Sequence, residues 1–357
     1  MSYRMVGAFL IIGALAIAFA IGGRPSNVKV LGSGSSFIYP QMSVWMRELR
    51  KKAPWITLNY NPVGSGTGQQ QFFSGLVDFA ASDPPLSEEK WAEHKGKVIQ
   101  MPIVLGAVAV VYNLPGVEEL RLDGRTLALI YSGEVKYWDD PEILKLNPGV
   151  NLPHKQIVAV HRSDSSGTTN VFTYFLHKAA PEVWPMERVG KTVDWPVDSL
   201  GRGVGSKGNQ GVAQTLANTP YSLGYVELSY AIQEGMKVAL IRNAEGRFVR
   251  PTVEGIMQAA KNAFERMPKS PLEDFSSDME ALILAPGEGS YPITSFVHLI
   301  FWTEYDEVKV KAIRRIIEFL NTEGQEMIVE GYAPIPAEMR RVNLKAVEYL
   351  RVSSHEG

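Results

Sequence analysis

The chain has 357 residues, of which 45% are hydrophobic and 21% charged, and its formal net charge is -2. This composition is globular, so it argues against disorder and fibrous repeats, and the length suffices for two domains. The absence of cysteine excludes disulfides, thiolate metal sites, cysteine nucleophiles and a lipid-modified N-terminal cysteine, and the near-neutral charge disfavours binding to nucleic acid by net charge.

The first predicted element is an apolar segment at the N-terminus. Residues 5–22 contain no charged side chain and lie between Arg4 and Arg24. This length fits both the hydrophobic region of a long signal peptide and a short membrane span. Ala18-Phe19-Ala20 also matches a small-x-small cleavage pattern. We therefore expect residues 1–25 to be a signal peptide or a membrane anchor, and the rest of the chain to be extracytoplasmic, either secreted or anchored by residues 5–22.

Three segments then repeat one pattern, in which an apolar strand leads through a Gly/Ser/Thr loop into an amphipathic helix. The strands and their loops are residues 28–31 with 32–36, residues 57–63 with 64–68, and residues 157–160 with 162–168. Strands that alternate with helices predict an α/β fold with mainly parallel sheets. Farther along the chain, helical spacing of apolar residues predicts a helix over 308–328.

Gly/Ser/Thr loops at the start of helices suit the binding of an oxyanion. The first turn of a helix has free N–H groups and the positive end of the helix dipole, and hydroxyl side chains add donors. Loops that follow parallel strands gather at the edge of the sheet where α/β proteins bind ligands. One such loop would be explained by helix capping alone, but three of them favour an anion site. Arg162 is the best candidate for a forked contact to oxyanion oxygens, with Asp164 placed to hold it.

An acidic residue sharpens the expected ligand. Residues 77–85 predict a short strand that ends in Ser82-Asp83 before a proline turn. An ionised aspartate only accepts hydrogen bonds, so it can accept the P–OH of hydrogen phosphate but would face an unpaired, repelled oxygen on sulfate. Alternatively, Asp83 simply caps the turn before Pro84, and these residues alone leave both interpretations open.

In this order, the segments resemble the phosphate-binding protein of ABC-type phosphate importers. The resemblance depends most on Ser-Asp-x-Pro-Leu-Ser at 82–87 and Arg-x-Asp-x-Ser-Gly-Thr at 162–168. The other matching stretches are 32–37, 64–65, 77–83, 130–133 with 138–139, 208–211, 224–227 and 291–295. Each Gly/Ser stretch is a weak signal, but the ordered set is specific and spans nearly all of the chain after residue 25.

The resemblance implies a two-domain periplasmic-binding-protein fold of type 2. Each domain would be a mostly parallel sheet flanked by helices, with phosphate enclosed in the interdomain cleft. Domain I would comprise residues 26–107 and 294–357, and domain II residues 108–293. The phosphate-binding residues implied are Ser36, Phe37 through its backbone N–H, Ser65, Asp83, Arg162, Ser166, Gly167 and Thr168, supported by Asp164 and Ser82.

The implied function is capture of hydrogen phosphate and its delivery to an ABC permease. The protein would be a monomer and not an enzyme, with no cofactor, no metal and no nucleic acid, and it would meet the membrane through its N-terminal segment or the permease. A phosphate sensor or scavenger without a permease is also possible, and two rival functions of other kinds remain. One is binding of another tetrahedral oxyanion such as sulfate or molybdate. The other is an exported phosphoester hydrolase with a nucleophile such as Ser166, although the sequence offers no evident base or metal set for it.

Two other motifs are expected to be unrelated to the function. Residues 203–208 match G-x-G-x-x-G, but no clear strand precedes them, so we expect a flexible loop near the cleft rather than a dinucleotide site. The six histidines lack the spacing of metal ligands. His161, beside Arg162, is expected to be a strand-end residue.

Overall fold

The computed structural model describes residues 27–354. The predicted signal peptide or anchor, residues 1–25, lies outside this range. Within the described part of the chain, no helix combines the length and the apolar character that crossing a membrane requires.

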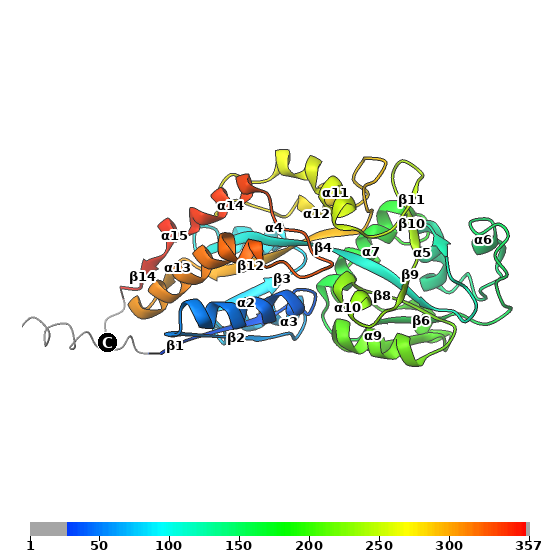
Figure 1. The fold of residues 1–357 in the computed structure, drawn as a ribbon, viewed down its shortest axis with the longest axis horizontal. Helices are drawn as coiled ribbons and strands as arrows, with labels where there is room; N and C mark the ends of the chain where they lie inside the picture. The colour runs from blue at the N-terminus through cyan, green and yellow to red at the C-terminus, as the bar shows by residue number, and fades with distance from the viewer. Residues whose placement is uncertain (1–26, 355–357) are drawn as a thin grey trace, which may run out of the picture.

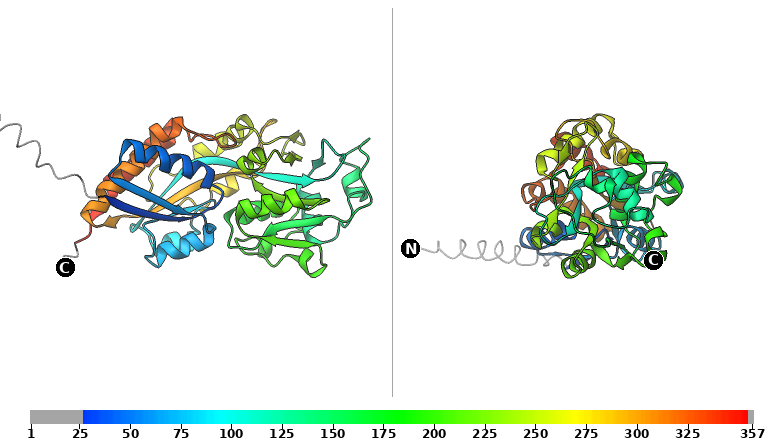
Figure 2. Two further views of the ribbon diagram at one scale, coloured as in Figure 1. Left: turned by 60° about the horizontal axis from the view of Figure 1, so that its bottom comes forward. Right: turned by 90° about the vertical axis from the view of Figure 1, so that its right-hand side faces the viewer.

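One sheet extends through the molecule and joins two lobes that lie end to end (Figures 1 and 2). Its strand order is β2-β1-β3-β12-β4-β8-β6-β7, and β9 also pairs with β4. The first lobe contains β1 (Val28–Gly34), β2 (Ile56–Asn61), β3 (Phe79–Ser82), β12 (Thr294–Trp302) and the start of β4 (Val98–Asn113). The second lobe contains the end of β4 with β6 (Val158–Arg162), β7 (Gly203–Ser206), β8 (Ser222–Glu227) and β9 (Lys237–Val238).

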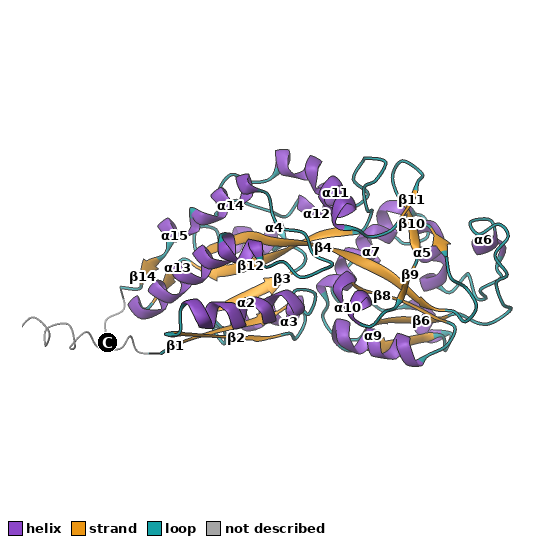
Figure 3. Cartoon of the chain, in the orientation of Figure 1, coloured by secondary structure: helices purple, strands orange, loops and turns teal. Residues whose placement is uncertain are grey.

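Helices flank the sheet in both lobes (Figure 3). The longer ones are α2 (Tyr39–Lys52), α3 (Ser65–Phe73), α5 (Gly124–Ser132), α7 (Gly167–Ala179), α9 (Gly208–Asn218), α11 (Val253–Arg266), α13 (Glu307–Asn321) and α14 (Ala337–Leu344). The shorter ones are α4 (Glu88–Glu93), α6 (Pro141–Leu144), α8 (Pro196–Ser199), α10 (Leu228–Gln233), α12 (Asp278–Leu282) and α15 (Ala346–Tyr349), with 3-10 turns η1 (Met186–Arg188) and η2 (Glu323–Glu326). Two small sheets are formed by β5 (Arg121–Leu122), β10 (Leu240–Arg242) and β11 (Phe248–Val249), and by β13 (Glu304–Tyr305) and β14 (Arg351–Val352).

The long strand β4 connects the two lobes. It is an almost continuous apolar run, and all of it except Asn113 is buried, as expected of a strand covered on both faces. Up to Ala107 it pairs with β12, and from Val108 onward it pairs with β8. The strand therefore changes its partner at the point where it passes from one lobe to the other.

The parallel pairs include the strands of all three predicted strand-loop-helix units, β1, β2 and β6. β1 pairs in parallel with β2 and β3, and β6 pairs in parallel with β7 and β8. Every antiparallel pair of this sheet involves β4 or β12. The predicted α/β class is confirmed, and the antiparallel pairs come from the two strands that lie between the parallel units.

Two local predictions were wrong. Residues 203–206 of the G-x-G-x-x-G stretch form the edge strand β7, because they pair with β6 rather than leaving the sheet as a loop. The helix predicted over 308–328 ends at Asn321, since Thr322 leaves helical geometry (φ -122°, ψ -100°) and the turn η2 follows.

Gly106 on β4 provides a test of the packing at the junction between the lobes. A Cβ atom at this position would lie 2.4 Å from Cε1 of the buried Phe37 ring. We therefore expect Gly106→Ala to lower the free energy of unfolding by about 1–3 kcal/mol through overpacking. Gly211 in α9 is the matched control, because a Cβ there would have no atom closer than 3.8 Å. Gly211→Ala should raise the same quantity by about 0.5–1 kcal/mol. Urea unfolding measures both, and equal effects of the two substitutions would contradict the packing argument.

Candidate functional site

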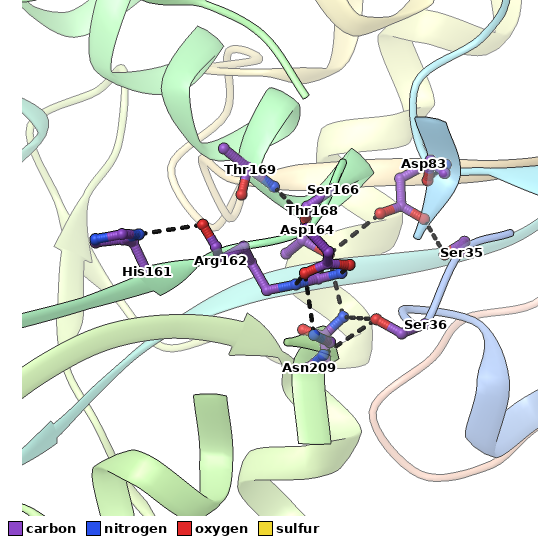
Figure 4. A network of polar contacts seen from close by, with 12 residues as sticks. Ser35, Ser36, Asp83, His161, Arg162, Asp164, Ser166, Thr168, Thr169 and Asn209 are labelled. Atoms are coloured by element: carbon purple, nitrogen blue, oxygen red, sulfur yellow. Dashed lines mark hydrogen bonds and ion pairs between the residues drawn. The ribbon is translucent and has the colours of Figure 1, made fainter. Parts of the chain in front are cut away.

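Loops from the two lobes meet where β1, β3 and β6 end (Figure 4). Ser35 and Ser36 follow β1, and Asp83 follows β3, all in the first lobe. In the second lobe, Arg162 is the last residue of β6, and Gly167 begins α7. The side chains drawn in Figure 4 therefore come from strand ends and helix starts, as a binding site in an α/β protein requires.

Asp83 is a buried carboxylate, with only 1% of its surface exposed. Ser35 Oγ donates a hydrogen bond to Oδ1, and Thr168 Oγ1 donates to Oδ2 across 3.2 Å. Burial raises the pKa of Asp83 to about 6, although the hydrogen bond from Ser35 and the charge of Arg162 oppose this effect. At neutral pH the group is thus ionised and accepts hydrogen bonds only.

Arg162 is held in one orientation by Asp164. Its Nε lies 2.6 Å from Asp164 Oδ1, and its Nη2 lies 2.5 Å from Asp164 Oδ2. Burial would raise the pKa of Asp164, but the hydrogen bonds and the charge of Arg162 outweigh burial and lower it. The forked pair leaves Nη1 of the arginine directed to Thr168 Oγ1, at 3.4 Å. A guanidinium fixed in this way can donate to an anion without reorganising.

The first turn of α7 lies against Asp83. Ser166 is the N-cap of this helix, and its Oγ accepts a hydrogen bond from Thr169 N at 3.0 Å. Gly167 permits the close approach, since a Cβ atom there would lie 2.2 Å from Ser65 Oγ and 2.6 Å from Asp83 Oδ2. The positive end of a helix is therefore placed beside the buried carboxylate.

The structure brings most of the predicted site residues together and gives two of them other contacts. Ser36, Ser65, Asp83, Arg162, Asp164, Ser166, Gly167 and Thr168 all lie at this junction. The ring of Phe37 packs edge-on against Tyr332, with ring centroids 6.3 Å apart, so only its backbone is near the site. Ser82 Oγ accepts from Gln69 Nε2 and donates to Pro84 O. The proline turn is thus held by Ser82, whereas the carboxylate of Asp83 accepts its hydrogen bonds from Ser35 and Thr168.

Sequence reasoning missed Asn209, near the N-terminus of α9. Its Nδ2 donates to Ser36 Oγ at 2.9 Å and to Thr168 Oγ1 at 3.1 Å, and its Oδ1 accepts from Glu227 N at 2.8 Å. Its stretch, 208–211, was among the matching motifs, but no role was assigned to it. The sequence did contain one signal, an asparagine that follows a glycine at the start of a helix. An asparagine side chain can donate and accept hydrogen bonds at the same time, so it can connect several groups of a polar site.

Glu227 is a second buried carboxyl group near the site that was missed. Burial raises its pKa to about 8, against the hydrogen bonds from Ser229. Only Oε2 accepts those bonds, while Oε1 has no hydrogen-bond partner. At neutral pH the group is therefore mostly protonated, and it adds little negative charge beside Asp83.

His161 is at the end of β6, as expected. Its Nε2 lies 2.7 Å from Asp198 Oδ1, and its ring stacks on Trp195 with centroids 5.0 Å apart. Its Nδ1 contacts the carbonyl of Arg162 at 3.1 Å. The ring of His161 lies on the side of Arg162 away from Asp83 (Figure 4).

The sequence is similar to known proteins that all belong to one superfamily or share one name. A family model described as "PBP superfamily domain" matches residues 22–320. The chain is 38% identical to a phosphate-binding protein PstS of Methanocaldococcus jannaschii over 97% of this chain and 95% of that protein. It is also 38% identical to a protein of the same name from Pasteurella multocida, over 91% and 92% of the two chains.

Two solved structures are similar in fold. One is a high-affinity periplasmic phosphate-binding protein with bound phosphate, with 23% identity and a TM-score of 0.69 over 89% of this chain and 93% of that one. The other is an ABC-type phosphate transport receptor from Vibrio cholerae, with 17% identity and a TM-score of 0.56 over 86% and 100%. At these identities the structures establish the fold alone.

The raised pKa of Asp83 has a measurable effect on stability. A carboxyl group whose pKa rises from 3.8 to about 6 on folding contributes stability below pH 3.8 that is lost as the pH rises through 6. Asp83→Asn should therefore raise the free energy of unfolding of the ligand-free protein by about 1–3 kcal/mol at pH near 7.5.

The advantage of this variant over the parent should shrink toward about pH 4, where the parental carboxyl group is protonated as well. The matched control is Asp194→Asn at an exposed position, which should change stability by less than about 0.5 kcal/mol. Urea unfolding at both pH values is the measurement. An Asp83→Asn protein that is less stable than the parent at neutral pH would contradict the argument.

Proposed function

Because the chain belongs to the family of phosphate-binding proteins named PstS, within the PBP superfamily, we propose that it captures inorganic phosphate and delivers it to an ABC permease. The observation that carries this proposal is the junction of a buried acceptor, Asp83, with the donors of Arg162 and the first turn of α7. An acceptor among donors matches an anion that still carries a proton.

In this proposal the donors hold the phosphate oxygens and Asp83 accepts the P–OH. The donors are the hydroxyls of Ser36, Ser65, Ser166 and Thr168, the guanidinium of Arg162, and backbone N–H groups at Phe37 and Gly167. The residues are largely buried, so each hydrogen bond acts in a medium that screens charge poorly. Most of the attraction comes from dipoles and hydroxyls, because Asp164 already balances the charge of Arg162.

Selection against sulfate follows from the same carboxylate. An ionised Asp83 has lone pairs but no proton to offer. Hydrogen phosphate presents a hydroxyl to it, whereas sulfate presents a charged oxygen that would remain unpaired and repelled. The same reasoning disfavours molybdate.

We further propose that the two lobes close around the anion. Donors come from both sides, and side chains already connect the lobes, as Asn209 does with Ser36 and Thr168 does with Asp83. The domain division at 26–107 with 294–357, and 108–293, is consistent with the change in partners of β4 at Ala107 and Val108. Closure of this kind brings both sets of donors to one ligand.

We also propose an extracytoplasmic location for the chain and a membrane permease as its partner. Residues 1–25 would export the chain or anchor it, so that capture takes place outside the cytoplasm and the monomer meets the permease at the membrane. Binding rather than turnover is favoured, because Ser166 Oγ is engaged in capping α7. Within residues 27–354, no basic side chain forms a hydrogen bond with that oxygen.

Titration calorimetry with phosphate and with sulfate tests the proposed ligand. We expect phosphate to bind with a dissociation constant at or below about 1 μM, equivalent to about 8 kcal/mol. Sulfate should bind at least about 100-fold more weakly, a difference of about 2.7 kcal/mol. Tight sulfate binding, or no phosphate binding at micromolar concentrations, would refute the proposal. Release of p-nitrophenol from its phosphate ester would instead support the hydrolase.

Replacing the carboxylate tests the origin of selectivity. Asp83→Asn should narrow the preference for phosphate over sulfate about tenfold or more, because an amide can donate to a sulfate oxygen. Asp194→Asn removes the same charge from an exposed position and should keep the parental preference. If Asp83→Asn rejects sulfate as strongly as the parent does, the selectivity does not come from acceptance of the P–OH hydrogen bond by Asp83.

A further inference from the structure

The charges at the proposed site do not balance around Asp83. The guanidinium of Arg162 is paired with Asp164, and the ring of His298, which also acts on Asp83, lies 2.6 Å from Oδ2 of Asp278. Each of these pairs therefore adds little net charge. Asp83 is ionised at neutral pH, and hydrogen phosphate would add further negative charge next to it. Placing like charges together in a buried site is unfavourable unless a second cation is near.

Lys191 is such a cation, and it comes from the second lobe. It lies between η1 and α8. Its Nζ donates a hydrogen bond of 2.7 Å to Gln69 Oε1 on α3, in the first lobe. Gln69 Nε2 in turn donates to Ser82 Oγ at 2.9 Å. A chain of hydrogen bonds thus leads from the lysine to the residue directly before Asp83.

The backbone of Lys191 is fixed to the other side of the same site. Its carbonyl oxygen accepts a hydrogen bond from Ser166 N at 2.8 Å, and Ser166 is the N-cap of α7. One residue therefore contacts the helix start on one lobe and, through its side chain, α3 on the other. This placement requires that both lobes be in contact, because Gln69 and Ser166 belong to different lobes.

The charge of Lys191 is coupled to that of Asp83. Burial lowers its pKa to about 8, and the charge of Asp83 opposes this effect. The ammonium group is partly withdrawn from water and senses the carboxylate at the end of β3. A second negative charge at the site would therefore stabilise the protonated lysine further.

We propose that Lys191 is the second cation of the phosphate site, which bridges the lobes and offsets the charge of Asp83 without contacting the anion. This inference rests on the proposed function and deepens it. Lys191 is a positioning residue, because it acts through Gln69 and through its field. Its contribution requires the closed arrangement, so it favours anion binding and lobe contact together.

The proposal makes the affinity for phosphate depend on pH in a defined direction. The protonated lysine favours the anion, so affinity should fall as the pH rises above about 8, where the ligand-free lysine loses its proton. Inorganic phosphate is already the dianion in this range and keeps its P–OH. The groups that face the lysine are Asp83 from β3 and the uncharged Gln69 from α3. Glu227 on β8 also titrates at about 8 and senses Asp83, so variants at 191 must separate the two.

Calorimetry at about pH 7.5 and about pH 9.5, at one ionic strength, tests the proposal with Lys191→Gln and Lys191→Arg. The Gln variant should bind phosphate about tenfold more weakly than the parent at the lower pH, about 1.4 kcal/mol. The two should converge at the higher pH. The Arg variant stays protonated, so it should keep the affinity that the parent loses. Any effect of Glu227 is common to all of these proteins and cancels in the comparison.

Two further variants separate charge from structure. Lys136→Gln removes an exposed lysine over Tyr137 and should bind like the parent at both pH values. Gln69→Ala removes the bridge but keeps the lysine charge, so its loss of affinity should be smaller than that of Lys191→Gln. Thermal unfolding of each variant checks that it is folded.

The possible failures are distinguishable. If the parent binds phosphate and Lys191→Gln binds it equally well at the lower pH, the role of Lys191 is overturned and the proposed function stands. If Lys191→Arg loses affinity with pH as the parent does, the pH dependence belongs to another group and the inference is also overturned. If the parent itself does not bind phosphate, both the function and the inference are overturned.

Discussion

The hydrogen bond between Thr168 and Asp83 is the contact on which the arrangement of the site depends. It joins the first turn of α7 to the end of β3, and so connects one lobe to the other through a buried carboxylate. Burial alone would make such a charge unfavourable, as the raised pKa of Asp83 indicates. The neighbouring hydroxyls, the helix dipole and the charge of Arg162 reduce this penalty without removing it. A protonated anion that donates to Asp83 would add a further donor to those of Ser35 and Thr168.

The charged side chains of the site are paired, which fixes their orientation and leaves little net charge. Arg162 and Asp164 form a forked pair, and Asp164 also accepts from Gly208 N at the start of α9. The arginine is therefore positioned from two elements of the second lobe. This explains why a chain with a net charge of -2 is compatible with anion binding: local donors act at short range, while net charge acts over the whole surface.

The sequence predicted the residues whose chemistry depends on neighbours along the chain. Arg162 ends β6 two residues before Asp164, and Asp83 follows a short apolar strand, so their types and positions were informative. Asn209, Glu227 and Lys191 were missed for the opposite reason. Each is placed at the site by residues far away in the sequence, and in isolation each is an ordinary polar residue. The strand β7 was missed because its pairing with β6 outweighs the weak strand preference of a glycine-rich stretch.

The continuous strand β4 has a consequence for how the protein unfolds. Its two ends belong to the hydrogen-bond ladders of different lobes, with β12 on one side and β8 on the other. Opening either ladder would expose unpaired N–H and C=O groups on a strand that is otherwise buried. If one lobe unfolded alone, β4 would lose its hydrogen-bonded partner in that lobe while it remained paired in the other lobe. The shared strand thus couples the two halves, and this coupling favours unfolding of both lobes together over melting of one alone.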